Sequence, residues 1–102
     1  MRITWLGHSA FHLELAGKHI LIDPFWTGNP KFPQGYEERV AKVDAIVVTH
    51  GHDDHFGDTP RLAQKYNATV IAQWEICMEV ASAGVTKIQP MNTGGAIEVD
   101  GI

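Results

Sequence analysis

The stretch DAIVVTHGHDDHFGD, residues 44–58, indicates both the fold and the chemistry of this chain. Its first part, from Asp44 to Thr49, is predicted to be a strand, and the apolar run that it contains is typical of a strand buried on both faces of a parallel sheet. Its second part contains three of the six histidines of the chain. Because this cluster directly follows the strand, we expect it at the carboxyl end of a sheet, where open α/β sheets bind ligands.

The spacing of the cluster favours a metal site. His50 and His52 are two residues apart, so an extended backbone lets both imidazoles point the same way, and Asp54 and His55 follow after one spacer. Imidazole and carboxylate together suit zinc, and also iron or manganese. The alternative is a solvated loop that is rich in histidine by accident. The H-x-H-x-D-H pattern immediately after a strand argues against that alternative.

Outward from this stretch, the sequence predicts an α/β fold with a mixed sheet. Downstream, strands alternate with helices, which implies parallel pairing through right-handed crossovers. Upstream, short strands are spaced as an antiparallel meander. The strands are expected at 3–6, 10–15, 18–23, 44–49, 69–72, 86–89 and 96–99, and the helices at 59–67 and 74–83, with a further helical turn or two at 37–42 and a turn at 92–95.

Two features of the upstream region are its long loop, for which two alternatives are open, and its isolated histidines. The segment 24–36 combines prolines and glycines with four aromatic residues. It is either a loop folded onto the core or a flap that faces a substrate. His12 and His19, which stand alone on predicted strands, are expected to face the solvent and not to bind a ligand.

Composition narrows the class of protein. The 102 residues predict one domain, and 44% hydrophobic with 20% charged residues is typical of a soluble globular protein. The net charge of −4 and the scattered basic residues argue against nucleic-acid binding. No segment is long and apolar enough to span a membrane, so the default location is the cytoplasm. The single cysteine, Cys77, is expected to fill the core and not to act as a nucleophile or ligand.

The segment His50–His55 with its flanking Thr49 and Gly57 resembles the signature of the metallo-β-lactamase superfamily. Two further segments, Trp5-Leu-Gly-His-Ser-Ala-Phe11 and Leu21-Ile-Asp-Pro-Phe25, are similar to the branch of metal-dependent hydrolases that includes L-ascorbate-6-phosphate lactonase. The resemblance covers residues 1–102. It implies half of an αββα sandwich, so residues 1–102 are expected to be the truncated N-terminal half of a hydrolase domain.

The resemblance also implies roles for individual residues. His50 and His52 would bind a first divalent metal, and Asp54 and His55 a second, with zinc expected and manganese or iron as alternatives. Asp54 would also orient the nucleophile as a catalytic residue. Asp23 would brace the metal loop without touching the metal, or else simply cap the turn before Pro24. His8 would lie near the cleft and contact the substrate or a metal, or else be a turn residue.

The activity implied by the resemblance is hydrolysis of a lactone, ester or phosphodiester by a metal-activated hydroxide in a dinuclear site. The substrate would be a small molecule, and two divalent ions would attract an anionic one. The superfamily takes further ligands from later in the chain, and no histidine follows His55. The partner is therefore either a missing C-terminal half or a second copy in a homodimer that binds metal without efficient catalysis.

Overall fold

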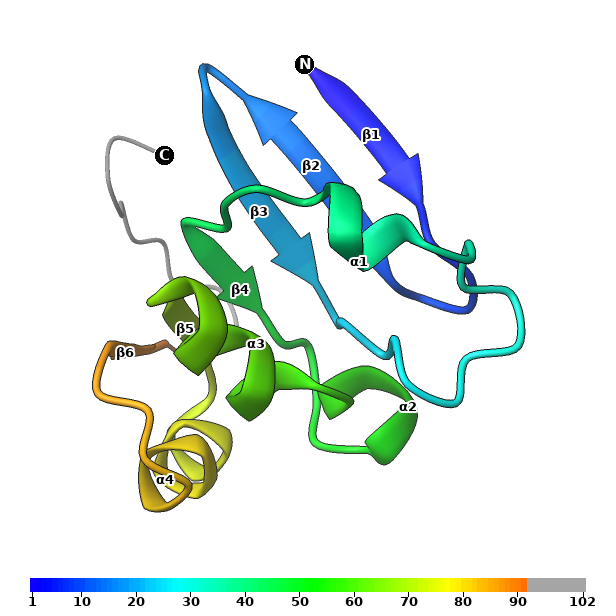
Figure 1. The fold of residues 1–102 in the computed structure, drawn as a ribbon. Helices are drawn as coiled ribbons and strands as arrows, with labels where there is room; N and C mark the ends of the chain where they lie inside the picture. Colours follow the sequence, from blue (N-terminus) through cyan, green and yellow to red (C-terminus); the bar gives the residue numbers. More distant parts are fainter. Residues whose placement is uncertain (92–102) are drawn as a thin grey trace.

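The computed structural model describes residues 1–91, which form a six-stranded sheet with the order β1-β2-β3-β4-β5-β6. The chain therefore adds each new strand beside the previous one, as Figure 1 shows. The strands are β1 (Arg2–Trp5), β2 (Phe11–Leu15), β3 (Lys18–Ile22), β4 (Ala45–Val47), β5 (Thr69–Ala72) and β6 (Ile88–Pro90). The helices are α1 (Tyr36–Arg39), α2 (Asp53–Phe56), α3 (Thr59–Tyr66) and α4 (Trp74–Ser82).

The pairing confirms the predicted mixed sheet. β1, β2 and β3 are antiparallel neighbours, with Ile3 opposite Leu13 and Leu13 opposite Ile20. β3, β4, β5 and β6 are parallel; α2 and α3 lie between β4 and β5, and α4 lies between β5 and β6. β6, which is expected at 86–89, begins two residues later, at Ile88, and ends at Pro90. The turn and strand predicted at 92–99 lie outside the described residues.

The two faces of the sheet are covered differently. One face packs under α1, α3 and α4, and its core includes Leu21, Ile46, Leu62 and Val80, all of them fully buried. Figure 1 shows α1 and α3 in front of this face. The opposite face carries a smaller apolar cluster, built on Ile20, Ala45 and Ile71 and joined by Leu13, Val47 and Met91. Thus both faces of the central strands are apolar, as expected for parallel strands.

The loop between β3 and α1 folds onto the core through its aromatic side chains. Trp26 is 3% exposed, and its ring lies 5.0 Å from that of Phe32 and 6.3 Å from that of Tyr36. These contacts support the first of the two alternatives for residues 24–36. The predicted helical turn at 37–42 is α1, which begins at Tyr36 and ends at Arg39.

The prediction that His12 faces the solvent is wrong. His12 is 4% exposed, because α1 and the loop before it cover its face of β2. Its Nδ1 lies 2.6 Å from the Tyr36 hydroxyl and its Nε2 lies 2.9 Å from Nδ1 of His19. A buried imidazole requires such partners, and both of its nitrogens have one. His19 itself is half-buried.

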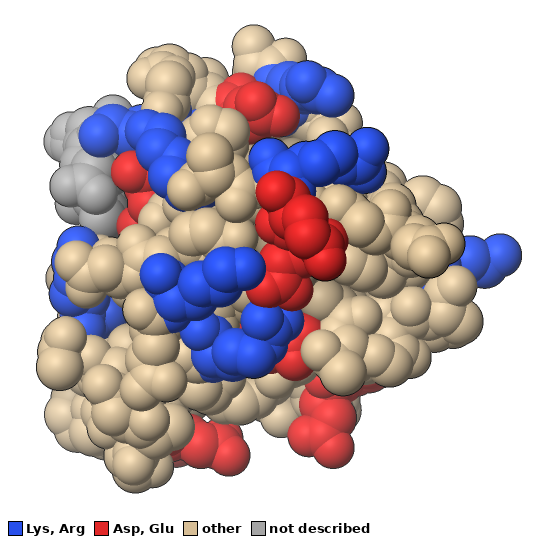
Figure 2. Space-filling view, in the orientation of Figure 1, with Lys and Arg blue, Asp and Glu red and all other residues tan. Residues whose placement is uncertain are grey.

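An ion-pair network on the surface joins α1 to α3. Glu37 accepts two hydrogen bonds from Arg61, at 2.7 and 3.0 Å, and one from Lys65 at 2.8 Å. Figure 2 shows acidic side chains flanked by basic ones in the middle of this face of the molecule. The bidentate contact with Arg61, followed by the contact with Lys65, lowers the pKa of Glu37 to about 2 from its ordinary 4.5.

Glu37→Gln is expected to lower the free energy of unfolding by about 1 kcal/mol at pH 7, since exposed networks are screened by solvent. The folded pKa is depressed, so the stabilisation is complete above pH 4.5 and is lost as the pH falls through about 2. Urea unfolding of both proteins at a series of pH values measures this difference. Glu38→Gln, an exposed neighbour on the same helix, is the control. An equal effect of both substitutions at pH 7, or a difference that does not shrink in acid, would contradict the assignment.

Among residues 1–91, no helix combines the length and the apolar character that crossing a membrane requires.

Candidate metal centre

The predicted site residues come together at one edge of the sheet. His8 lies in the turn after β1, Asp23 follows β3, and the segment His50–His55 follows β4. β1, β3 and β4 run in the same direction, because β2 is antiparallel to both β1 and β3, and β4 is parallel to β3. Their carboxyl ends therefore meet at the same edge, as the sequence predicts.

Asp23 is the buried anchor of this edge. It is 2% exposed, and its Oδ1 accepts the backbone N–H of Thr49 at 2.7 Å. Its Oδ2 accepts the Thr49 hydroxyl at 2.6 Å and lies 2.8 Å from Nδ1 of His55. The carboxylate therefore holds both the start of the histidine segment and one of its imidazoles. A carboxylate with these contacts could orient His55 if that imidazole bound a metal.

Three of the predicted residues form a compact ligand cluster. Single ligand atoms of His8, Asp54 and His55 all lie within 4.8 Å of one another. His8 Nε2 is 3.2 Å from Oδ2 of Asp54, and His55 Nε2 is 3.8 Å from Oδ1 of Asp54. His55 turns Nδ1 toward Asp23, which leaves Nε2 on the side of Asp54. Two imidazoles and one carboxylate can hold a divalent metal.

His50 and His52 lie beside this cluster, but they are not among the residues whose ligand atoms all lie within 4.8 Å of one another. The His50 ring centroid is 3.8 Å from that of His55 and 4.8 Å from that of His52. His50 Nδ1 also lies 3.1 Å from the Thr49 hydroxyl. The structure thus gathers all three imidazoles of the motif, but groups Asp54 and His55 with His8 rather than with His50 and His52.

The turn that carries His8 is braced by two residues that the sequence analysis did not single out. Trp5 donates its indole N–H to the carbonyl of His8 at 2.7 Å. Asn29, which is 7% exposed, donates to the carbonyls of Leu6, Gly7 and Phe25 at 3.3, 3.0 and 2.9 Å. His8 has a φ of +54°, which a residue with a side chain adopts at some cost. These contacts stabilise that backbone conformation.

Gly57 allows the loop after β3 to pack against the segment that follows His55. It has a φ of +48°, and a Cβ atom there would lie 2.5 Å from the carbonyl oxygen of Pro24 and 2.6 Å from Cα of Phe25. The N–H of Asp58 donates to that same Pro24 carbonyl at 3.0 Å, and the N–H of Thr27 donates to the Asp58 carboxylate at 2.7 Å. The segment that follows His55 is therefore held against the loop that follows Asp23.

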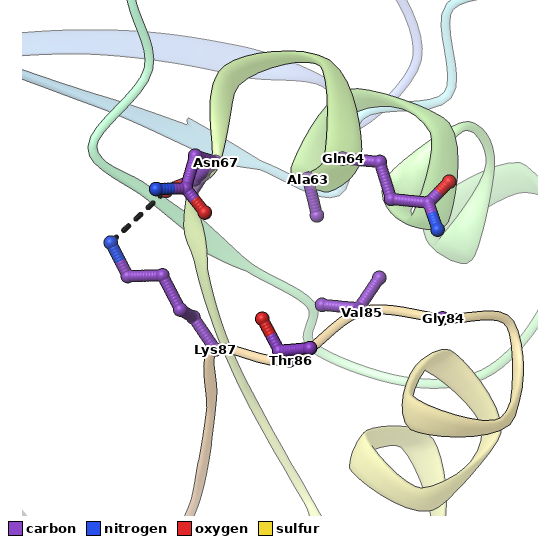
Figure 3. Close-up of a pocket in the computed structure, with 8 residues that line it drawn as sticks. Ala63, Gln64, Asn67, Gly84, Val85, Thr86 and Lys87 are labelled. Atoms are coloured by element: carbon purple, nitrogen blue, oxygen red, sulfur yellow. Dashed lines mark hydrogen bonds between the residues drawn. The ribbon is translucent and has the colours of Figure 1, made fainter.

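Other candidate groups lie away from this edge. Cys77 is fully buried on α4, and burial raises the pKa of its thiol, which disfavours the reactive thiolate. A cavity of about 180 Å³ between the end of α3 and the segment after α4 is lined by residues such as Gln64, Asn67 and Lys87. Figure 3 shows Lys87 bonded across it to Asn67, and no predicted site residue lines it.

The mixed sheet and the cluster at its edge define the class of this protein, an α/β protein with a candidate site for divalent metal. The cluster offers a donor set of imidazole and carboxylate groups, which fits zinc, manganese or iron. The contact of Asp23 with Nδ1 of His55 is of the kind that a metal-binding imidazole usually makes through its other nitrogen, so it would suit His55 as a ligand.

Comparison with known proteins gives the family. Residues 2–100 match the model of the "Beta-lactamase superfamily domain", and the chain belongs to this superfamily. It is similar to proteins named "UPF0173 metal-dependent hydrolase" from Methylobacterium nodulans, 50% identical over 101 residues, and Sinorhizobium medicae, 52% identical over 100 residues. The matches cover 96% and 97% of this chain and 43% of each relative, so the chain spans less than half of their length.

A solved structure shares the fold. The chain superposes on Igni18, described as a novel metallo hydrolase from Ignicoccus hospitalis, with a TM-score of 0.83 and 35% sequence identity. The superposition covers 96% of this chain and 42% of Igni18. The predicted α/β architecture is thereby confirmed as part of a metallo-β-lactamase type of fold.

Proposed function

We propose that this chain provides one side of the active site of a metal-dependent hydrolase. The observation that carries the proposal is the cluster of His8, Asp54 and His55 at the sheet edge, with His50 and His52 beside it. The names of the relatives support the reaction class. A bound divalent ion lowers the pKa of water to about 7 and polarises the bond under attack.

The proposed ligand roles follow the motif and the geometry together. His50 and His52 hold one of two metals, while Asp54 and His55 hold the other. His55 offers Nε2, because its Nδ1 faces the Asp23 carboxylate. Asp54 has a second task, since one of its oxygens lies near His55 and the other near His8, so it can orient the attacking water. His8 either is a further ligand of the second metal or contacts the substrate.

We propose a small anionic substrate with a lactone, ester or phosphodiester bond. Two divalent ions would offset the net charge of −4 of the chain and make this edge attractive to anions. The sequence resemblance to the lactonase branch supports a lactone or a phosphorylated compound. Hydrolysis of such a panel with added Zn²⁺ or Mn²⁺, and its loss on chelation, tests the reaction class. A metal-loaded protein that hydrolyses none of them would contradict it.

The remaining ligands come, we propose, from a second half-domain. The sheet face away from the helices carries the apolar Ile20 cluster, and at its β1 edge Ile3 and Trp5 are 58% and 57% exposed. An apolar face of this kind suits a second sheet, as in a four-layer sandwich. The second half is either further residues of the same polypeptide or a second copy of this chain. Intact mass and sedimentation of the native protein separate the two arrangements.

His52→Ala is expected to lower the metal content sharply while leaving the fold in place, because His52 is exposed and outside the core. Elemental analysis after dialysis measures the stoichiometry, and circular dichroism checks the fold. His19→Ala, which removes an imidazole from the opposite end of β3, is the control and should retain the full metal content. Unchanged metal stoichiometry in His52→Ala would remove this residue from the site.

A further inference from the structure

We propose that a hollow between α1 and the sheet is a second ligand site, one that binds a small oxyanion such as a carboxylate or a phosphate. The hollow has a volume of about 360 Å³. Its polar lining consists of Arg2, His12, Glu14, His19, Tyr36 and Arg39. None of these side chains has a role in the metal centre proposed above.

The hollow lies at the end of the sheet opposite to the metal centre. Arg2 begins β1 and His19 is the second residue of β3, whereas His8 and Asp23 follow the ends of the same strands. Asp23 follows His19 by four positions along an extended strand, which corresponds to about 13 Å. A ligand in the hollow would therefore not touch the metal ligands.

A chain of three polar side chains forms the floor of the hollow. The Tyr36 hydroxyl, the His12 ring and the His19 ring are linked by contacts of 2.6 and 2.9 Å. Burial, followed by the nearby His19, lowers the pKa of His12, so this imidazole is neutral at pH 7. A neutral imidazole has one donor and one acceptor nitrogen. When Tyr36 donates to His12, His12 donates in turn to His19, and Nε2 of His19 then carries the proton.

In that arrangement the N–H at His19 Nε2 is a hydrogen-bond donor for an anion. An anion that accepts a hydrogen bond from His19 Nε2 would fix the direction of the hydrogen bonds among Tyr36, His12 and His19. With its proton on Nε2, neutral His19 accepts from His12, and His12 then accepts from Tyr36. The half-buried His19, which lines the hollow, then offers this N–H to a bound anion.

The charges around the hollow favour an anion over a cation. Arg39 holds its guanidinium 5.3 Å from the centre of the Tyr36 ring, and Arg2 lies 3.6 Å from the Glu14 carboxylate. Two guanidinium groups against one carboxylate leave a positive charge in excess. Figure 2 shows lysine and arginine side chains on the upper part of this face, where β1–β3 and α1 lie, with acidic side chains between them.

The competing occupant is a divalent cation. His12 and Glu14 share one face of β2, and His19 is opposite Glu14 on β3, so two imidazoles and one carboxylate belong to neighbouring positions of the sheet. Arg2 already pairs with Glu14, and both arginines repel a cation. The described residues give ligand atoms of three such groups within 4.8 Å only at the metal centre. The anion is therefore the occupant that the geometry supports.

The test is a titration of the native protein, followed by the NMR signals of the His12 and His19 imidazoles and the Arg39 guanidinium. Sodium phosphate is the probe in one arm and sodium succinate in the other, with the ionic strength held constant by sodium chloride. Saturable shifts of these signals are expected. Phosphate alone would identify a phosphate site, and a response to both would include carboxylates. Because the signals belong to residues of the hollow, the result is independent of any anion bound at the metal centre.

Two variants make the test specific. Arg2→Gln combined with Arg39→Gln should weaken phosphate binding by about tenfold or more, since it removes two charged hydrogen-bond donors. Lys87→Gln removes a positive charge just before β6, at the other end of the sheet from β1 and β2, and should leave the affinity within about twofold. The proposal is overturned by an absence of saturable shifts with both anions, by equal affinity in the double variant, or by shifts that appear with Zn²⁺ instead.

Discussion

Asp23→Asn is expected to lower the metal affinity of the protein by about 10–100-fold. The carboxylate of Asp23 accepts from the backbone and hydroxyl of Thr49 and from His55. With an aspartate at this position, His55 is protonated at Nδ1 and keeps the lone pair on Nε2 for a metal. An amide that donates to Nδ1 would select the opposite tautomer, and Nε2 would then carry a proton.

The same substitution should also destabilise the fold by about 2 kcal/mol, because a buried amide cannot accept all three hydrogen bonds. Asp44→Asn is the matched control, since Asp44 accepts the N–H of His19 at 2.8 Å at the opposite end of the sheet. This control should lose some stability and keep its metal affinity. Metal titration and urea unfolding of both variants measure the two effects. Equal metal affinity in both variants would show that Asp23 does not act on the metal ligands.

Gly57→Ala is expected to give the largest loss of stability of any small substitution near the site, about 3 kcal/mol or more. The new Cβ would lie 2.5 Å from the Pro24 carbonyl oxygen and 2.6 Å from Cα of Phe25, both of them backbone atoms that cannot move independently. The positive φ of +48° adds backbone strain. Because His55 lies two residues before Gly57, the metal content should fall as well.

Gly17→Ala separates strain from the steric clash. Gly17 has a φ of +78°, and a Cβ atom there would have no neighbour within 4 Å. Its substitution should therefore cost only the strain of positive φ, about 1 kcal/mol. Thermal and urea unfolding of the two variants give the comparison. If the Gly57→Ala protein were as stable as the Gly17→Ala protein, this result would show that the loop after Asp23 does not lie against the segment that follows His55.

The α/β architecture could be predicted because each element carries a local signal. The apolar run at 45–48, the proline after Thr59 and the glycine after α4 all fall at element boundaries that the structure confirms to within a few residues. α2 was not predicted, since its four residues, Asp53–Phe56, are too short to show helical periodicity. They also form part of the histidine motif, whose composition reflects ligand chemistry.

The burial of His12 could not be predicted from the alternation in β2. The alternation of Leu13 with His12 and Glu14 suggested one apolar and one solvated face, but the face that carries His12 is covered as well. Leu13 joins the apolar cluster on one face, and His12 is covered by α1 on the other. What makes the burial of His12 tolerable is Tyr36, which is 24 residues away in the sequence. Contacts at that separation leave no local pattern.

The candidate site also has some features that the sequence predicts and others that it does not. The histidine motif is local, so its residues and their position after β4 could be predicted from spacing. Asp23 was expected at this edge from the family resemblance, and the structure places its carboxylate against Thr49 and His55. The bracing of the His8 turn by Trp5 and Asn29 depends on backbone carbonyls, which carry no sequence signal.

The central claim is that the imidazoles and the carboxylate after β4 share bound metal. Anomalous X-ray scattering at the zinc edge, from crystals of the protein grown with Zn²⁺, tests it most directly. We expect a peak at about 2.0–2.2 Å from imidazole nitrogens or carboxylate oxygens of the His8, Asp54 and His55 cluster, with a second near His50 and His52. Zinc found only elsewhere on the surface, or no peak at this edge of the sheet, would contradict the account.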